Sequence, residues 1–333
     1  MGKEIYVDTL KSEQMLGEEF EELFMVKDTK LTRSLSNKWT NLTLFDRTGE
    51  IPGIIFGEDA VNAEKLKGSI VKARGLVTLY NGECRATVKS VVPVELKDVS
   101  LSDFVPGLTK EKVAELFGRL NNLLGQIASN APLLCLVRSV YQKYGKDFIQ
   151  LPGGYMHHRY AGGLLAHSVE CAEMAALICD QQTGAFYENS TGVNRELVIA
   201  GALLHDIGKV FEFEVFPFGA KKENAPFLNY KVRGTVMLTE IVKQIVKMYP
   251  NTAEKWKTEL PVLCNMALSC HKKNDEPPRT KEARIVMLAD ISSADTDACA
   301  FEESKVNQDN PDGGFFYSRY FGCNMKSPGK EAV

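Results

Sequence analysis

The sequence lacks most features that mark secreted, membrane-spanning or disulfide-stabilised proteins. Its 333 residues include eight cysteines, but these form no CxxC pair and no regular framework, which favours reduced thiols and argues against a zinc ribbon. No stretch approaches the roughly 20 apolar residues that span a bilayer. The first residues, Met-Gly-Lys-Glu-Ile-Tyr, lack the apolar run of a signal peptide. We therefore predict a cytoplasmic protein with no membrane partner.

A strong net charge is also missing. The formal charge is −3, from 40 Lys and Arg against 43 Asp and Glu, so any binding to nucleic acid requires a local patch. The hydrophobic content of 44% and the charged content of 25% are ordinary for a globular protein. Since single cores stop growing near about 250–300 residues, the length predicts two domains.

Residues 23–98 show the pattern of a small β-barrel. Alternating or apolar runs at 26–31, 39–45, 51–56, 70–80 and 84–94 predict five strands, with a short helix at 58–67. The dipeptide Asn81-Gly82 is a strong hairpin signal. Three strands, a helix and two strands suit a five-stranded OB barrel. Residues 1–22 are expected to form an N-terminal arm.

The predicted barrel is locally basic. Residues 23–97 contain 12 Lys and Arg against 8 Asp and Glu, an excess of +4. Basic and aromatic side chains alternate there, as the binding of single strands without sequence readout requires. The predicted nucleic-acid contacts are Lys30, Arg33, Lys38, Trp39, Tyr80 and Arg85. Trp39 is the foremost candidate for stacking on a base, because it follows a polar turn. The alternative is that Phe45 and Phe56 belong to the barrel core and the charges form a solvated face.

From about residue 99 the pattern becomes helical. Thr109 is a candidate N-cap before apolar residues at steps of three and four, and Pro132 begins a second helix. We expect residues 99–150 to supply linking helices and residues 151–333 to form an all-α domain, which makes the chain a multidomain α+β protein. The aromatic residues between 315 and 321 are expected to pack back on the body.

Four polar side chains in this second region are predicted to be buried. His167 and Asp290 each share a helical stripe with apolar residues, and His205-Asp206 ends a helix that is apolar nearly all round. Burying carboxylates beside imidazoles costs several kcal/mol unless a cation or donors compensate. A divalent ion bound by all four would compensate. Two imidazoles and two carboxylates favour Mn²⁺, Fe²⁺ or Co²⁺, with Zn²⁺ as an alternative. The structural alternative is a His–Asp pair held by internal hydrogen bonds.

These residues carry a family resemblance. The order His167, His205-Asp206 and Asp290 resembles the HD superfamily of metal-dependent phosphohydrolases. The phrases HHRYAGGLLAHS and LLHDIGK, with DFVPGL at the junction and the barrel in front, resemble the YhaM-type 3′-to-5′ exoribonucleases, also described as CMP-binding factor. The resemblance runs over nearly the whole chain. It implies removal of nucleotides from the 3′ end of single-stranded RNA, and of DNA as a second substrate, with Mn²⁺ as the foremost candidate ion.

The same resemblance suggests roles for individual residues. Asp206 would ligate the metal and orient a water, and Lys209 would balance charge growing on the phosphate. The alternative for Lys209 is a solvated surface lysine. His158 would donate a proton to the leaving oxygen or contact a phosphate, and His157 is a candidate for a phosphate contact or a second metal. Both histidines have an alternative role in supporting the metal ligands.

The sequence departs from the pattern of two-metal members of the superfamily. These are expected to carry a further histidine after the HD motif, where this chain has Gly234, and later a His-His pair, where it has Cys270-His271. We therefore predict one tightly bound ion per chain, with Cys270 and His271 as candidates for a second site or a phosphate contact.

Two other functions remain open from the sequence. One is an HD enzyme that acts on mononucleotides or cyclic dinucleotides, with the barrel used for assembly. The other is a nucleic-acid-binding factor whose HD site is weakened, which the change at Gly234 favours. The sequence also leaves open whether the chain forms a homo-oligomer.

Overall fold

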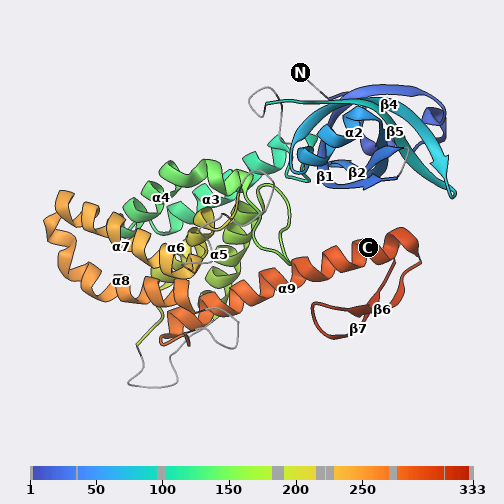
Figure 1. Ribbon diagram of the computed structural model, residues 1–333. Coiled ribbons are helices and arrows are strands. Elements are labelled where there is room, and N and C mark those ends of the chain that lie inside the picture. Colours follow the sequence, from blue (N-terminus) through green and yellow to red (C-terminus); the bar gives the residue numbers. More distant parts are fainter. Residues whose placement is uncertain are drawn as a thin grey trace. The chain divides into compact units, whose positions relative to one another are not determined.

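The computed structural model describes residues 3–34, 37–95, 99, 103–181, 191–214, 222, 229–269, 276–310 and 312–329. Within these ranges the chain forms two compact units that meet in sequence between Gly107 and Leu108. The first holds five long strands, and the second holds the long helices and a small hairpin (Figure 1). This confirms the predicted α+β class with a barrel ahead of a helical region.

The first unit is a closed five-stranded barrel. Its strands are β1 (Glu19–Arg33), β2 (Lys38–Asp46), β3 (Gly49–Phe56), β4 (Ile70–Tyr80) and β5 (Glu83–Pro93), in the spatial order β1-β2-β3-β5-β4. Only the β3–β5 pairing is parallel. The helix α2 (Glu58–Ala63) and the short η2 (Glu64–Leu66) connect β3 to β4, which is the arrangement of an OB-like barrel. Asn81 and Gly82 have φ of 52° and 84°, as the predicted β4–β5 turn requires.

The expected N-terminal arm is part of this barrel unit. Two short helices, α1 (Val7–Leu10) and η1 (Glu13–Met15), precede β1, and Val7 and Leu10 are buried in the same core cluster as the inward side chains of the strands. The Lys3 ammonium lies 3.2 Å from the Asp46 carboxylate, with both side chains fully buried. This buried ion pair connects the start of the described chain to β2.

The first strand is longer than its sequence pattern suggests. It begins at Glu19 rather than near residue 26, because Glu19 and Glu21 face solvent and pair with basic residues of β4 and β5. Glu19 contacts Arg74 at 3.2 Å and Lys89 at 2.5 Å, and Glu21 contacts Lys72. Acidic residues are poor strand formers in isolation, so the cross-strand partners, and not local propensity, extend β1.

The second unit is a helical body around α5 (Gly163–Gln181). The other long helices are α3 (Lys110–Gln126), α4 (Ala131–Gln150), α6 (Arg195–Leu204), α7 (Tyr230–Met248), α8 (Ala253–Leu268) and α9 (Lys281–Asp309). Short 3₁₀ turns occur at η5 (Ile207–Phe211) and η7 (Pro250–Thr252). The helices α3 and α4 were expected to link the domains, but Leu116, Leu120 and Val140 are buried in the core of the helical unit. They are therefore integral to this unit.

The helix α9 carries a hairpin at its C-terminal end, formed by β6 (Gly314–Ser318) and β7 (Cys323–Ser327) (Figure 1). The expectation that the terminal aromatic residues pack back is correct for Tyr320, whose hydroxyl lies 2.9 Å from the Asp295 carboxylate. It is wrong for Phe315 and Tyr317, which are 80% and 63% exposed. Tyr320 lies in the turn after β6, whereas alternation along β6 places Phe315 and Tyr317 on the face opposite the buried Ser318.

Among the described residues, no helix is both long and apolar enough to cross a membrane. The seven cysteines in this part of the chain are free thiols. Cys270 lies outside the described residues.

Two glycines allow the helix α7 to approach η5 closely. A Cβ on Gly208 would lie 1.8 Å from the Tyr230 carbonyl oxygen, and a Cβ on Gly234 would lie 3.3 Å from the Gly208 nitrogen. Backbone therefore packs on backbone at this crossing. The crossing is next to His205 and Asp206, so it also fixes the turn that presents them.

We expect Gly208→Ala to lower the free energy of unfolding by about 1–3 kcal/mol, because the added methyl group overpacks a rigid backbone contact. Gly118→Ala is the matched control: Gly118 is exposed in the middle of α3, with nothing within 4 Å of its Cβ position. That change should raise stability by up to about 1 kcal/mol through helix propensity. Denaturant titrations of the two variants measure both effects, and equal stabilities would contradict the packing argument.

Candidate metal centre and nucleic-acid surface

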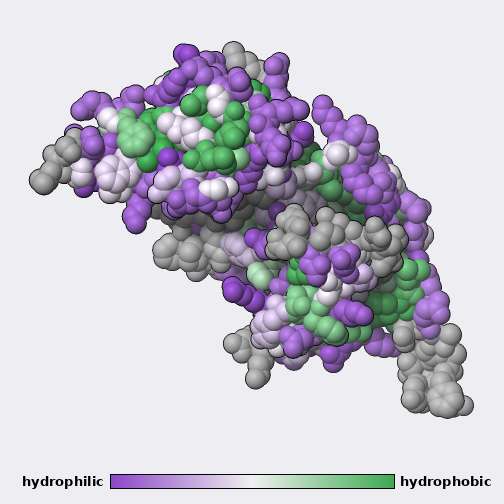
Figure 2. Space-filling view, turned by 90° about the vertical axis from the view of Figure 1, so that its right-hand side faces the viewer, coloured by the Kyte–Doolittle hydropathy of each residue, from purple (hydrophilic) through white to green (hydrophobic). Residues whose placement is uncertain are grey.

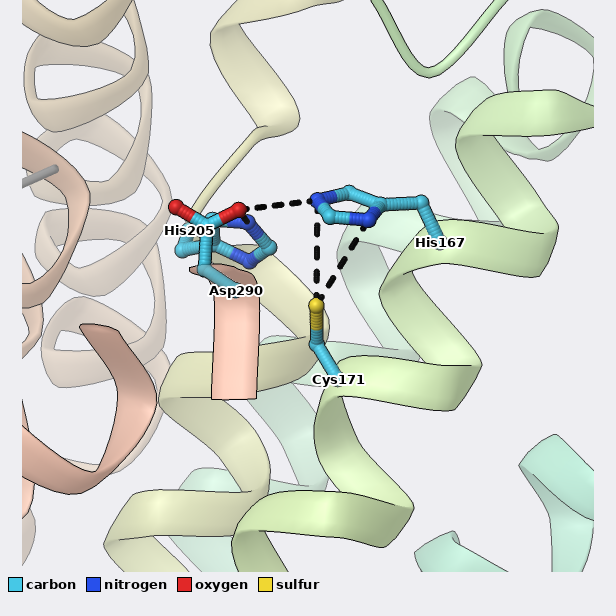
Figure 3. A group of neighbouring side chains, drawn as sticks. All are labelled: His167, Cys171, His205 and Asp290. Atoms are coloured by element: carbon cyan, nitrogen blue, oxygen red, sulfur yellow. Dashed lines mark hydrogen bonds and ion pairs between the residues drawn. The ribbon is translucent and has the colours of Figure 1, made fainter. Parts of the chain in front are cut away.

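Three helical segments bring the predicted metal ligands together. His167 lies on the second turn of α5, His205 follows the end of α6, and Asp290 lies on α9 (Figure 3). Asp206 is the residue after His205. The four side chains are 5% exposed or less. The helix α6 is apolar and buried, so the polar residues at its end are buried too, as the apolar run before His205 predicts.

The ring nitrogens and carboxylate oxygens of this cluster face one another. His167 Nε2 lies 3.4 Å from Asp206 Oδ2 and 3.2 Å from Asp290 Oδ1. His205 Nε2 lies 3.5 Å and 3.7 Å from the same two oxygens. These separations are longer than most charged hydrogen bonds. Both imidazole nitrogens therefore lie within 3.7 Å of the same two carboxylate oxygens. One group of mutually close potential ligand atoms contains His167, His205 and Asp290 but not Asp206, whose Oδ2 also contacts Lys209.

His205 provides the test of whether a metal fits. Its Nδ1 donates to the Ala202 carbonyl at 2.7 Å, which leaves the lone pair on Nε2. That Nε2 is buried and has no hydrogen-bond partner within the described structure. A histidine held by a backbone carbonyl with its other nitrogen unsatisfied is the usual state of a metal ligand. The donor set thus fits a divalent ion, and internal hydrogen bonds alone leave His205 unsatisfied.

His167 is held by a chain of polar contacts behind the cluster. Its Nδ1 lies 3.1 Å from the Ser293 hydroxyl, which in turn donates to Glu170 Oε2 at 3.0 Å. Burial works against a charge on His167, but the Cys171 thiol and the Asp206 and Asp290 carboxylates raise its pKa well above the ordinary value. The raised pKa favours the charged imidazole, whose single positive charge offsets one of the two carboxylates.

Asp206 is ionised for a related reason. Burial opposes its charge, but Lys209, His205 and His167 hold the pKa of this carboxyl well below its usual range. The Lys209 ammonium lies 2.5 Å from Asp206 Oδ2 and also donates to the Gly153 carbonyl. Lys209 is 5% exposed, so the alternative of a solvated surface lysine is wrong. It is fixed beside the cluster as a buried positive charge.

Cys171 is a neighbour that the sequence did not identify as a candidate ligand. It lies one helical turn after His167, with Sγ 3.6 Å from Nδ1 and 3.7 Å from Nε2, and belongs to a group of potential ligand atoms with His167, His205 and Asp290 (Figure 3). Burial raises the pKa of its thiol. Cys171 is therefore a packing neighbour of the cluster that also offers a sulfur atom, and a bound metal would favour its thiolate form.

A glycine-rich loop brings His157 and His158 against α5. His158 has a φ of 47°, unusual for a residue with a side chain. Its backbone nitrogen donates to Asp297 at 2.5 Å and its Nε2 lies 3.0 Å from Glu170 Oε2. A Cβ on Gly163 would lie 2.1 Å from the His158 carbonyl oxygen, so only glycine allows this approach. One backbone contact and one ring contact therefore position His158.

His157 lies between this loop and the cluster. Its Nδ1 is 3.1 Å from His158 Nδ1, and its ring centroid is 4.8 Å from that of His167. Burial, reinforced by the Lys209 ammonium, lowers the pKa of His157 to about 2, so its ring is neutral. The three histidines form a second group of potential ligand atoms, but His167 belongs to both groups, so the second is not an independent site.

The candidate second-site residues are only partly described. Gly234 contacts Gly208 and Ile207, so it lies beside the turn that carries His205 and Asp206, here called the HD turn. Glycine offers no ligand atom there. Cys270 and His271 lie outside the described residues. The supporting residues Glu170, Ser293 and Asp297 were missed from the sequence. Ser293 and Asp297 lie one and two helical turns after Asp290, so the α-helical spacing was the available signal.

On the barrel, part of the predicted nucleic-acid surface forms a cleft. Lys30, Tyr80 and Arg85 line a cavity of about 440 Å³ between β1, β2, β3 and the β4–β5 turn. The Arg85 guanidinium lies 4.2 Å from the centre of the Tyr80 ring, and Tyr80 is 55% exposed. Arg33, Lys38 and Trp39 are not among the residues that line this cavity.

Trp39 instead belongs to an aromatic pair on the outer face of the barrel. It is half-buried and lies directly opposite Phe56, which is 54% exposed, so both rings lie on the same face. Phe45 alternates with the buried Leu44 and is on this outer face too. The interpretation of Phe45 and Phe56 as barrel core is therefore wrong, because strand alternation places them away from it.

The barrel is less basic as a whole than residues 23–97 suggest. Starting the barrel at β1 adds Glu19, Glu21 and Glu22, which reduces the excess of positive charge from +4 to +1. The barrel is therefore nearly neutral as a whole, and the basic side chains predicted to contact nucleic acid are a local feature.

These features define an OB-like barrel followed by a helical domain of the HD type. The family model described as the HD domain matches residues 164–295, a range that contains His167, His205, Asp206 and Asp290.

Over most of its length the chain is similar to proteins named 3′-5′ exoribonuclease YhaM. The relative from Oceanobacillus iheyensis is 26% identical over 289 residues, covering 84% of this chain and 85% of the relative. One from Listeria monocytogenes is 25% identical over 324 residues, with 94% and 95% covered. Among solved structures, the second OB-fold domain of replication protein A from Methanococcus maripaludis aligns with 24% of this chain and 86% of its own, at 22% identity and a TM-score of 0.20.

We expect Asp206→Asn to lose the metal while the protein stays folded, because the amide keeps the shape of the side chain but not its charge. It should also destabilise the metal-free form by about 3–5 kcal/mol, since Lys209 is left buried without a counter-ion. This deficit should shrink as the pH falls below about 4, where the unfolded carboxyl becomes protonated. Elemental analysis and denaturant titrations provide the measurements.

Glu240→Ala is the matched control for this variant, because Glu240 is an exposed carboxylate that pairs with Lys243 in the same unit. Undiminished metal content in Asp206→Asn would show that Asp206 is not a metal ligand.

Proposed function

We propose that this protein is a metal-dependent 3′-5′ exoribonuclease that hydrolyses single-stranded RNA, with the barrel holding the strand and the helical unit cutting it. The observation that carries the metal site is the buried, unpartnered Nε2 of His205 beside His167 and two carboxylates. The similarity to YhaM proteins along most of the chain supports the choice of substrate and polarity.

In this proposal His167, His205, Asp206 and Asp290 hold one divalent ion, with Mn²⁺ as the foremost candidate. When bound, such an ion supplies Lewis-acid chemistry: it makes a water acidic and offsets charge on a phosphate oxygen. Fe²⁺, Co²⁺ and Zn²⁺ are alternatives on the same donor set. The single ion per chain rests on Gly234, which supplies no ligand atom beside the HD turn.

The remaining residues of the site act through charge and position. Asp206 accepts from Lys209, which keeps the carboxylate ionised and places a positive charge near the substrate phosphate. Neutral His157 offers a ring nitrogen for a phosphate contact or a proton relay. His158, fixed by Glu170 and Asp297, supports the loop that carries His157, and this positioning role is favoured over direct proton donation. The reaction breaks the P–O bond to the 3′ oxygen and adds water across it.

Two features favour a polynucleotide over a mononucleotide or cyclic dinucleotide substrate. The barrel presents the Trp39–Phe56 pair and the cleft with Lys30, Tyr80 and Arg85, which suit a strand whose bases stack without being read. A barrel used only for assembly has no need of them. The cytoplasmic location, the use of DNA and the oligomeric state stay predictions.

We expect 5′-labelled single-stranded RNA with Mn²⁺ to shorten stepwise, and 3′-labelled RNA to release a single labelled nucleotide at once. Gel analysis of the two labels, with a DNA strand of the same sequence in parallel, reads out polarity and preference. Asp290→Asn should be inactive, and Glu240→Ala should behave as the unchanged protein. Internal cuts, or hydrolysis of a cyclic dinucleotide alone, would contradict the proposal.

The barrel surface gives a separate prediction. Trp39→Ala should weaken binding of single-stranded RNA by about 1–3 kcal/mol if the ring stacks on a base, while Trp39→Phe should retain much of the affinity. Hydrolysis of a small phosphodiester should not change in either. The affinity should also fall with salt, with a slope of about −0.7 per phosphate neutralised. Fluorescence anisotropy and melting temperature are measured on the same samples.

The matched control for Trp39 is Leu79→Ala, which removes an exposed apolar side chain, 55% exposed, from the same barrel without removing a ring. A lower melting temperature of Trp39→Ala with unchanged RNA affinity would show that Trp39 stabilises the barrel and does not contact nucleic acid.

A further inference from the structure

Two aromatic side chains of the C-terminal hairpin are exposed. Figure 2 shows for comparison that one face of the molecule is largely hydrophilic, with hydrophobic residues gathered in a few green patches. Among the large apolar side chains that the structure describes, Phe315 has the highest exposed fraction, 80%, and Tyr317 is 63% exposed. Both belong to β6, two residues apart, so they lie on one face of the strand.

The hairpin is anchored by its other face. Ser318 is buried, Ser327 Oγ contacts the Asn307 side chain at 2.7 Å, and Tyr320 bonds Asp295. These contacts fix β6 and β7 against α9. Phe315 and Tyr317 are therefore exposed while the hairpin is packed against α9. Their rings face outward and make little apolar contact with the helical unit.

The outward face is polar and positive around the rings. Lys326 lies directly opposite Phe315, and Asn324 lies directly opposite Tyr317, so these side chains share the face. Residues 313–329 contain Arg319 and Lys326 but no Asp or Glu. Neither cation forms an ion pair in the part of the chain that the structure describes. In a chain of net charge −3, this segment suits an anionic, planar ligand.

A second copy of the chain fits this face less well than a nucleic-acid strand. Two aromatic side chains bury about 150–250 Å² each, so a symmetric pair of hairpins would bury at most about 1,000 Å². Stable interfaces need about 1,200–2,000 Å². Two like-charged hairpins would also repel each other. Bases stacked on Phe315 and Tyr317, with Lys326 beside a phosphate, use both the rings and the charge.

The hairpin lies well away from the metal centre along α9. Asn307, which contacts Ser327, is 17 residues after Asp290 on the same helix, or about 25 Å at the rise of an α-helix. Phe315 pairs with Lys326, next to Ser327. A strand whose 3′ end lies at Asp290 therefore reaches these rings only through several nucleotides on its 5′ side.

We propose that Phe315, Tyr317 and Lys326 form a stacking platform for single-stranded nucleic acid, several nucleotides upstream of the scissile bond. This rests on the proposed function, in which the 3′ end occupies the metal centre. The platform adds affinity for long strands and contributes nothing to a dinucleotide. It acts on the same strand as the barrel but belongs to the helical unit.

The test compares strand lengths on the full-length chain. Phe315→Ala and Tyr317→Ala should each weaken binding of a single-stranded RNA of about 20 nucleotides by roughly 5–100-fold, as measured by anisotropy with the divalent ion chelated. Hydrolysis of a dinucleotide with Mn²⁺ should be unchanged. Tyr317→Phe should keep the affinity, since it retains the ring. The matched control is Tyr249→Ala, which removes a ring that is 54% exposed at the end of α7.

Several outcomes would overturn the platform. Unchanged affinity for long RNA in both alanine variants is one. A shift in association state by sedimentation, with RNA affinity unchanged, is another, because it would make the face a protein interface. Equal losses for long RNA and dinucleotide would show a general defect. A chain that binds RNA through the hairpin but never shortens it would instead refute the proposed nuclease activity.

Discussion

The helical unit is organised around two carboxylates that are buried in an apolar core. Asp206 and Asp290 are 3% and 5% exposed at their side chains, and an unpaired ionised carboxylate at such depth would cost many kcal/mol. His167, His205 and Lys209 supply the compensation from α5, the end of α6 and η5. These elements must therefore meet at one point. A divalent ion bound by these side chains, as proposed above, would offset the same two charges.

Close backbone packing is the second condition for this arrangement. Gly163 admits the His158 carbonyl, and Gly208 and Gly234 let α7 lie against the HD turn. Gly234 therefore has two consequences that belong together. It offers no ligand atom for a second metal, which is the basis of the predicted single ion, and it helps to form the crossing that holds His205 and Asp206.

In the proposed function, binding and cutting are divided between surfaces of different chemistry. The residues proposed to hold the metal and act on the phosphate are buried and charged, and they are held by partners within the core. The surfaces proposed to hold the strand are exposed rings beside cations: Trp39 and Phe56 on the barrel, and Phe315 and Tyr317 on the hairpin. Stacking of this kind tolerates any base, which suits an enzyme that must advance along a strand of varying sequence.

The sequence by itself determined the parts that follow from local pattern. Alternating runs and Asn81-Gly82 indicated the barrel, and polar residues at the end of an apolar helix indicated His205 and Asp206 as buried. The tertiary structure decided what depends on distant partners. The extension of β1 through Glu19 and Glu21 needs the basic residues of β4 and β5, and the burial of Lys209 needs the Gly153 carbonyl from another loop. The roles of Glu170 and Ser293 arise only where α5 crosses α9. These contacts join residues more than fifty positions apart. Local periodicity can place a side chain on a helix face, but only the folded chain shows which distant residue it meets.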